Sequence, residues 1–183
     1  ENQIDSVLAI ANMGNAIVFL DIQVGLSTVE KEVPLLEKYL KMPHVHLAID
    51  PEFSMKDGTP PGKKIGTYDA EDINYCSDFL VKLVRENTLP PKIFVIHRFT
   101  QHMITNYQQI NLHPEVQLVI NMDGWGAPPL KLNTYKQYIW REPVQFTGFK
   151  LFYKNDLRQF PHRMLTPAEL MRLQPHPIYI QYQ

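Results

Sequence analysis

The stretch HVHLAIDPEF, residues 44–53, decides how the rest of the sequence is interpreted. Its run from Val45 to Ile49 is typical of a buried β-strand, yet it leads directly into Asp50 and Glu52. Side chains two residues apart on a strand point to the same side. We therefore expect these two carboxylates to project together into one space at the C-terminal end of the strand.

Strands and helices alternate along the chain. Besides residues 45–50, apolar and β-branched runs predict strands at 16–23, 92–99, 116–123, 148–154 and 177–183. Apolar spacing and capping residues predict helices at 4–14, about 34–42, 69–87, 101–112 and 133–141, and after Thr166, which is followed by Pro167. A long Gly- and Pro-rich segment, 51–70, follows the second strand and is typical of a functional loop. This order predicts parallel β/α units.

One face of nearly every predicted strand is apolar, while the other becomes polar toward its C-terminal end. On the first strand, for example, Asp21 and Gln23 follow Phe19 on one side. In a β/α barrel the outer face packs on helices and the C-terminal mouth of the lumen holds the active site. An open sheet instead collects polar groups at one switch point, usually with a Gly-rich phosphate loop that this sequence lacks. The pattern predicts an α/β fold, the TIM-type (β/α)8 barrel.

A complete barrel has eight strands in about 250 residues, and this chain of 183 residues supplies six. We therefore expect one β/α-barrel domain over residues 1–183 that lacks its N-terminal part, so that the six strands are the third to the eighth. A smaller open sheet and a barrel completed by a second chain are the alternatives.

Composition excludes several classes of protein. The formal charge is −1 with Lys and Arg scattered, which argues against nucleic acid or an anionic membrane as a partner. The single cysteine, Cys76, rules out an internal disulfide and a thiolate zinc cluster. No apolar run is long enough for a transmembrane helix, and no signal peptide is visible.

Paired carboxylates at a barrel mouth predict glycoside hydrolysis of a carbohydrate or another small polar ligand, with no cofactor. We expect Glu52 to act as the acid and Asp50 to orient it, raise its pKa or stabilise positive charge developing on the sugar, with Asp123 or Asp21 as the second carboxylate. Trp125 offers an apolar face to a sugar ring. The remaining candidates for substrate binding are Gln23, His97, Asn121, Lys150 and Gln181.

Two other functions compete with this one. His97 and the carboxylates would suit a Mg²⁺- or Ca²⁺-dependent hydrolase, while a plugged lumen would favour a non-catalytic glycan-binding protein. Several residues also have structural interpretations: Lys150 neutralising Asp123 or Glu52, and Arg98 reaching a carboxylate on a neighbouring helix. His44 and His46 should lie at the closed end of the barrel, and the aromatic residues Tyr135, Tyr138 and Trp140 should belong to the core.

The motifs FLDIQVG, VHLAIDPEFSM, PPKIFVIHRFT, VINMDGWG, GFKLFYKND and PIYIQYQ resemble a family of bacterial proteins that has no established activity. The resemblance spans essentially the whole chain. It implies an exported protein or lipoprotein of the cell envelope, with a signal and further strands before Glu1. The segment AIDPE is more loosely similar to barrel glycosidases with Asp-x-Glu after the fourth strand, the lysozyme-like muramidases more than the chitinase group.

Overall fold

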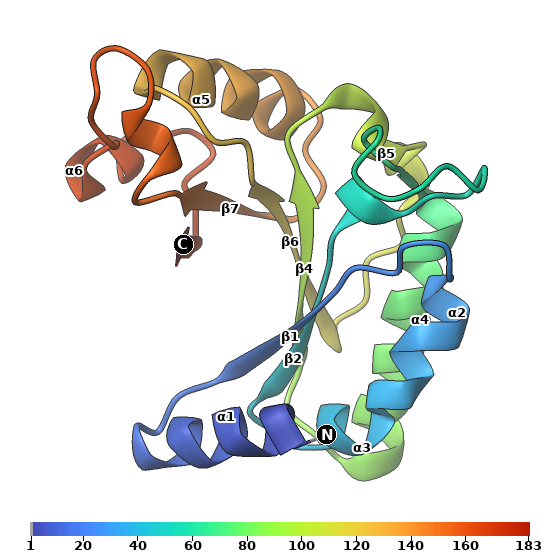
Figure 1. Ribbon diagram of the computed structural model, residues 1–183. Coiled ribbons are helices and arrows are strands. Elements are labelled where there is room, and N and C mark those ends of the chain that lie inside the picture. Colours follow the sequence, from blue (N-terminus) through green and yellow to red (C-terminus); the bar gives the residue numbers. More distant parts are fainter. Residues whose placement is uncertain (1) are drawn as a thin grey trace.

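The computed structural model describes residues 2–183, which form a six-stranded parallel sheet curled into a half barrel (Figure 1). The strand order β1-β2-β4-β6-β7-β8 follows the order of these strands along the chain. Their bounds are β1 Val18–Ile22, β2 Val45–Ile49, β4 Lys92–Arg98, β6 Val116–Met122, β7 Phe146–Leu151 and β8 Tyr179–Tyr182. The expected α/β architecture with parallel strands is therefore confirmed at this level.

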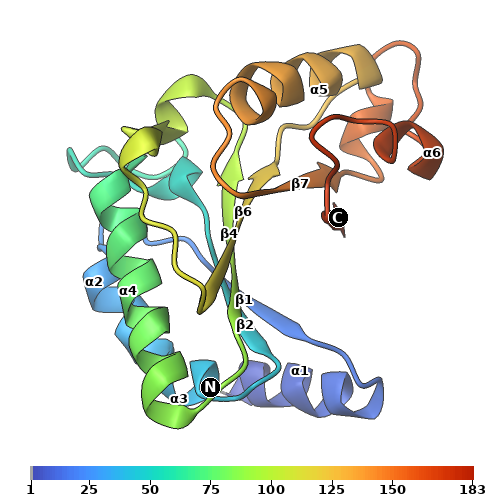
Figure 2. The ribbon, with the colours of Figure 1, turned by 180° about the vertical axis from the view of Figure 1, so that it is seen from behind.

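Helices cover the outer, convex face of the sheet (Figures 1 and 2). Ile73 and Leu80 of α4 are fully buried, as are the outward strand residues Leu47, Phe94 and Leu118 of the same core cluster. Apolar burial on this face holds the layers together. The helices are α1 Asn2–Met13, α2 Val29–Glu32, α3 Glu37–Leu40, α4 Ala70–Asn87, α5 Pro128–Tyr135 and α6 Pro167–Leu170, with a 3₁₀ turn at Val33–Leu36 and a π-helical turn at Lys136–Trp140.

The prediction of a helix at 101–112 is wrong. Two 3₁₀ turns, Gln101–Met103 and Tyr107–Gln109, flank a short strand, β5 (Ile104–Thr105), which pairs with β3 (Tyr68–Asp69). The Thr105 hydroxyl and the Asn106 amide both donate to Asp69 Oδ2, at 2.6 and 2.7 Å. Asn106 also has a positive φ of 54°, which ends any helix at that point. Tertiary hydrogen bonds to Asp69 therefore override the local apolar spacing.

The last long helix also differs from its prediction at 133–141. It begins earlier, with α5 at Pro128, and ends in the π-helical turn, which changes the face that each aromatic residue presents. Tyr135 is buried as expected, but Trp140 is 49% exposed, so its assignment to the core is wrong. The α6 cap is confirmed, because Glu169 N–H donates to Thr166 Oγ1.

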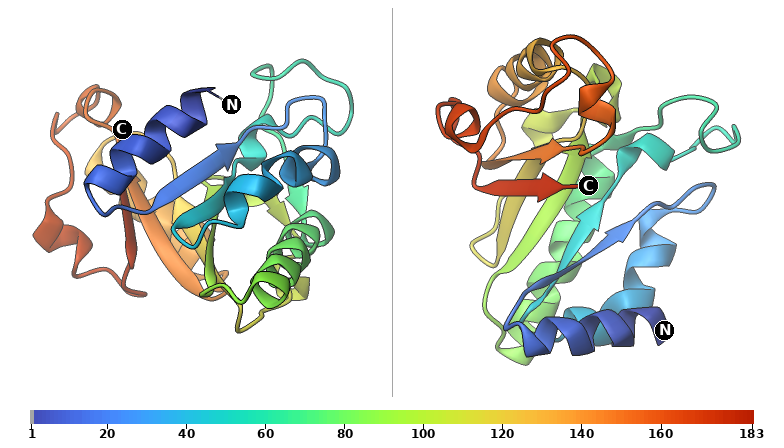
Figure 3. Two further views of the ribbon diagram at one scale, coloured as in Figure 1. Left: turned by 90° about the horizontal axis from the view of Figure 1, so that it is seen from below. Right: turned by 60° about the vertical axis from the view of Figure 1, so that its left-hand side comes forward.

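The curl brings the two edge strands toward each other across the lumen (Figure 3). The rings of Phe19 on β1 and Tyr179 on β8 meet edge to face, with centroids 5.2 Å apart. Both rings pack against a small apolar cluster of Ala48, Val95 and Val119, which fills the lower part of the lumen. The N-terminal end of the half barrel is thus closed by side chains, and any ligand space must lie at the C-terminal end.

Candidate functional site

Beyond this apolar cluster, toward the C-terminal ends of the strands, polar side chains form a row of alternating charges. His97, at the end of β4, places Nε2 2.8 Å from Asp21 Oδ2 and Nδ1 3.0 Å from Asp123 Oδ2. Lys150 on β7 continues the row, with Nζ 2.9 Å from Asp123 Oδ1. The His97 side chain is 2% exposed and that of Asp123 is 7% exposed. The four groups come from four different strands or strand ends, as expected from the sequence.

These contacts shift the pKa values of His97 and Asp123. Burial alone would lower the pKa of His97, but its hydrogen bonds to Asp123 and Asp21 outweigh burial and raise the pKa to about 10. Burial likewise opposes ionisation of Asp123, yet His97 and Lys150 hold its pKa below the usual value. The raised pKa of His97 favours its imidazolium form between the side chains of Asp21 and Asp123, and Lys150 forms an ion pair with Asp123, as the structural interpretation expected.

Asn121 on β6 and Gln181 on β8 also face the lumen, where their register partners are His97 and Lys150. Asn121 Nδ2 donates to Gln181 Oε1 at 3.1 Å, and Asn121 is fully buried. Gly148 on β7 leaves room for this amide, because a Cβ atom there would lie 2.7 Å from Asn121 Oδ1. A glycine at this strand position is therefore required by the packing of the lumen.

A tight turn directly after β2 arranges the side chains of Asp50 and Glu52. Asp50 caps the 3₁₀ turn Pro51–Phe53, with Oδ1 accepting from Glu52 N–H at 2.9 Å and Oδ2 accepting from the Gln23 amide at 3.0 Å. Asp50 is buried, and burial raises its pKa. Both carboxylate oxygens of Asp50 already accept a hydrogen bond, so this residue suits the role of orienting Glu52.

The Glu52 carboxylate is free of such contacts: within the described part of the chain, no hydrogen bond or ion pair holds it. Glu52 is half-buried, and its pKa is raised first by burial and then by the neighbouring charges of Asp50 and Asp123. Its backbone, however, is fixed, because Gly66 N–H donates to Glu52 O at 2.7 Å. A Cβ on Gly66 would lie 2.4 Å from Ser54 O, so only glycine lets the end of the long loop pack this closely against the backbone of Ser54.

A cleft of about 550 Å³ opens above these groups. It is lined by Gln23, Asp50, Glu52, Phe53, Ile65, Phe99, Asp123, Gly124, Trp125, Leu130, Thr134, Lys150, Phe152 and Gln183. Trp125 lines this cleft with 47% of its surface exposed, and the Arg158 guanidinium carbon lies over its ring, 5.9 Å from the centroid. The lining thus combines carboxyl groups and one ammonium with apolar and aromatic faces, a combination that suits sugars.

The structure brings together six of the ten predicted site residues in the cleft: Gln23, Asp50, Glu52, Asp123, Trp125 and Lys150. The other four, Asp21, His97, Asn121 and Gln181, are not in its lining; His97 contacts the cleft residue Asp123, and Asp21 lines a separate cavity. The expected position of the histidines is also found: His46 is buried near the N-terminal end of β2, where its Nδ1 accepts from Ile93 N–H at 3.1 Å. Burial lowers the pKa of His46 to about 4.

Sequence reasoning missed the pair that supports the Trp125 loop. Lys131 of α5 and Asp156 form an ion pair, with Nζ and Oδ2 3.0 Å apart and side chains 1% and 0% exposed. Lys131 also donates to Gly124 O at 2.8 Å, while Asp156 accepts from Gly126 N–H at 2.9 Å and Phe152 N–H at 3.0 Å. The pair therefore fixes the backbone on both sides of Trp125. Nothing in the local sequence pattern of either residue marks this contact.

Compared with protein-family models, curated proteins and solved structures, the chain matches none of them. The site must therefore be interpreted from its own geometry.

Two further observations limit that interpretation. Among residues 2–183, no group of three or more His, Cys, Asp and Glu side chains is arranged to hold a metal ion, so the metal-dependent alternative gains no support from the donor geometry. None of the helices described in the structure is both long and apolar enough to span a bilayer. Arg98 donates to Glu142, just beyond the π-helical turn, in agreement with its structural interpretation from the sequence.

Proposed function

We propose that the protein binds a carbohydrate in the cleft at the C-terminal end of the half barrel and hydrolyses a glycosidic bond there. The observation that carries this proposal is the contrast between Glu52 and its neighbours. Asp50 and Asp123 are both held by hydrogen bonds or ion pairs, while Glu52 is unheld and faces the cleft; the pKa of Glu52 is raised, as is that of Asp50. A raised pKa favours the protonated form of the carboxyl group, which is the form that a general acid uses.

The roles of the other residues follow from their contacts. Glu52 would donate its proton to the departing glycosidic oxygen, and a water molecule would then attack the anomeric carbon and return a proton to the Glu52 carboxylate. Positive charge developing on the sugar would be stabilised by the Asp50 and Asp123 carboxylates, which are fixed before the substrate arrives. Trp125 would pack against a sugar face, and Lys150 would hydrogen-bond a hydroxyl group.

The test compares Glu52→Gln with Glu71→Gln, a matched change at an exposed site in the first turn of α4. Both variants and the unchanged protein would be assayed for release of reducing ends from peptidoglycan glycan strands and chitooligosaccharides. We expect the unchanged protein and Glu71→Gln to hydrolyse one of these glycans and Glu52→Gln to be inactive but folded by circular dichroism. Full activity in Glu52→Gln would remove Glu52 from the mechanism.

A second candidate function, glycan binding without catalysis, is favoured by one observation. Both oxygens of Asp123 already face cations, at 3.0 Å from His97 and 2.9 Å from Lys150, so Asp123 is a poor nucleophile or base. Isothermal titration with the same glycans separates the two functions. Binding that is equal in the unchanged protein and Glu52→Gln, with no hydrolysis by either, would identify a binding protein.

We further propose that the half barrel belongs to a (β/α)8 barrel of the TIM type. Three features support this: the six parallel strands in chain order, the polar C-terminal mouth, and the contact of Phe19 with Tyr179 across a narrow gap. An N-terminal segment or a second chain would supply the other strands. The motif likeness described above supports an extracytoplasmic protein, secreted or lipid-anchored, and fractionation of cells expressing the whole gene would test this location.

A further inference from the structure

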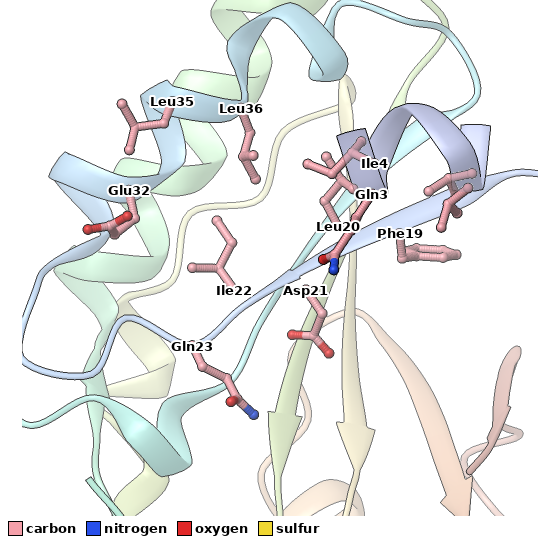
Figure 4. Close-up of a pocket in the computed structure, with 12 residues that line it drawn as sticks. Gln3, Ile4, Phe19, Leu20, Asp21, Ile22, Gln23, Glu32, Leu35 and Leu36 are labelled. Atoms are coloured by element: carbon pink, nitrogen blue, oxygen red, sulfur yellow. The ribbon is translucent and has the colours of Figure 1, made fainter. Parts of the chain in front are cut away.

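Asp21 belongs to the row of charges but lies outside the lining of the cleft. Figure 4 shows its side chain on the side of β1 opposite to Leu20 and Ile22. On that side its Oδ2 lies 2.8 Å from His97 Nε2. Asp21 lines a separate cavity along β1, and the cleft is lined by other residues. Any effect of Asp21 on a ligand in the cleft must therefore pass through His97.

The imidazole ring of His97 is held at both nitrogens. Nε2 faces Asp21, Nδ1 lies 3.0 Å from Asp123 Oδ2, and the side chain is 2% exposed. Asn121 Nδ2 is 3.4 Å from the same Nδ1, but an amide nitrogen is a donor and does not compete for the Nδ1 proton. Both carboxylates accept a hydrogen bond from the ring only when both nitrogens are protonated, which is the imidazolium form. A neutral ring has one N–H and can serve only one of them.

Asp123 carries this arrangement into the cleft, because it is part of the cleft lining. Its Oδ2 faces His97, and its Oδ1 lies 2.9 Å from Lys150 Nζ. A hydrogen bond between a charged donor and a carboxylate is about twice as strong as one between neutral groups. The charged form of His97 therefore holds the Asp123 side chain more firmly than the neutral form would.

From this geometry we propose that Asp21 is a positioning residue for the cleft: it keeps both nitrogens of His97 protonated, and His97 in turn fixes the direction in which the Asp123 carboxylate meets a ligand. This role rests on the proposed function for the identity of the ligand, a glycan. It adds to that function a residue that controls the site without touching the substrate. What lies beside β1 does not matter here, because Asp21 meets His97 inside the lumen.

The surrounding charges make Asp21 important for the charge of His97. Burial lowers the pKa of His97, and the hydrogen bonds to Asp123 and Asp21 reverse this effect and raise the pKa to about 10. Other titratable groups near the row come from four further elements: Asp50 and Glu52 after β2, Lys150 on β7, Lys131 on α5 and Tyr179 on β8. The two acids favour the imidazolium and the two lysines oppose it. The directly bonded carboxylates therefore decide its charge.

Nuclear magnetic resonance of the histidine rings tests the link from Asp21 to His97. The signals of His97 in ¹⁵N-labelled protein are those that His97→Gln lacks. We expect Asp21→Asn to lower the pKa of His97 by about 1–3, from about 10 to about 7–9, and Asp21→Glu, which keeps the charge, to lower it less. Asp78→Asn is the matched control, because Asp78 lies 3.2 Å from a different histidine, His113, and should leave the His97 signals unchanged.

The ¹³C signal of the Asp123 carboxyl group tests the link from His97 to Asp123 and requires no ligand. In Asp21→Asn this signal should shift at the pH at which His97 loses its proton, and in the unchanged protein at a correspondingly higher pH. Asp78→Asn should again behave like the unchanged protein.

Titration calorimetry with the glycan that the protein binds tests the effect on the cleft. At about pH 6, where His97 is charged in both proteins, Asp21→Asn should bind as tightly as the unchanged protein. At about pH 9 only the unchanged protein keeps the charge, so Asp21→Asn should bind about fivefold more weakly. This recovery at low pH separates positioning from damage to the fold, which would weaken binding at both pH values.

Three results would overturn the proposal. The first is the same pKa of His97 in Asp21→Asn and the unchanged protein. The second is an Asp123 signal that does not follow the titration of His97. The third is a loss of glycan affinity in Asp21→Asn that is equal at the two pH values. If no glycan binds while both resonance expectations are met, the proposed function fails, whereas control of Asp123 by Asp21 is confirmed.

Discussion

Replacing Lys131 by methionine tests whether the buried ion pair supports the Trp125 loop. The change keeps the length of the side chain but leaves Asp156, which is 0% exposed, without its cation. Breaking one side of a buried pair costs about 3–5 kcal/mol. Asp156 keeps hydrogen bonds from two backbone N–H groups, Gly126 and Phe152, so we expect a loss near the lower end, about 3 kcal/mol.

Urea and thermal denaturation measure this loss. For a chain of this size about 1 kcal/mol corresponds to about 2–4 °C, so Tm should fall by about 6–12 °C. Lys82→Met is the control, because Lys82 is 66% exposed and its pair with Glu86 should contribute less than about 1 kcal/mol. The double variant Lys131→Met/Asp156→Asn should be destabilised by less than the sum of the single changes. A Lys131→Met variant as stable as Lys82→Met would refute the reasoning.

Three further predictions concern the lumen and the cleft. Gly148→Ala forces a methyl group against the Asn121 amide and should cost about 1–3 kcal/mol in urea denaturation, whereas no loss would show that Asn121 moves freely. The raised pKa of His97 contributes stability that is complete below about pH 6.5 and disappears as pH rises through about 10; His97→Gln should lack this trend in Tm between those values. Trp125→Ala should weaken glycan binding by about 0.5–1.5 kcal/mol in titration calorimetry without changing Tm, unlike Trp140→Ala, which should leave binding intact.

The strands and the residues facing the lumen were predictable because both depend on local alternation. Asp21, His97, Asp123 and Lys150 occupy the faces that parity assigned to them, since a strand reverses its side chains at every residue. The distinction between residues in the cleft and residues beneath it was not predictable in the same way. Glu52, in the turn that follows β2, lines the cleft, whereas His97, at the end of β4, does not.

The errors share a different cause, which is dependence on distant parts of the chain. The segment 101–112 is not helical because the side chains of Thr105 and Asn106 donate hydrogen bonds to Asp69, more than thirty residues earlier. Lys131 resembles an ordinary surface lysine on a helix, and only the return of the chain at Asp156 buries it. Contacts of this kind are fixed by tertiary packing, which a periodic pattern does not contain.

The row of alternating charges explains why one carboxyl group differs from the rest. Asp123 forms ion pairs with His97 and Lys150. Asp50 accepts hydrogen bonds from the Gln23 side chain and from the backbone N–H of Glu52. Each of these contacts lowers the energy of a carboxylate that burial would otherwise protonate. Glu52 receives no such contact within residues 2–183, and it experiences the negative charges of the two acids that do. The pKa of Glu52 is therefore raised on the one carboxyl group of the three that no hydrogen bond or ion pair holds, and substituting His97 should raise the pKa of Asp123 by removing one of the two cations that hold it down.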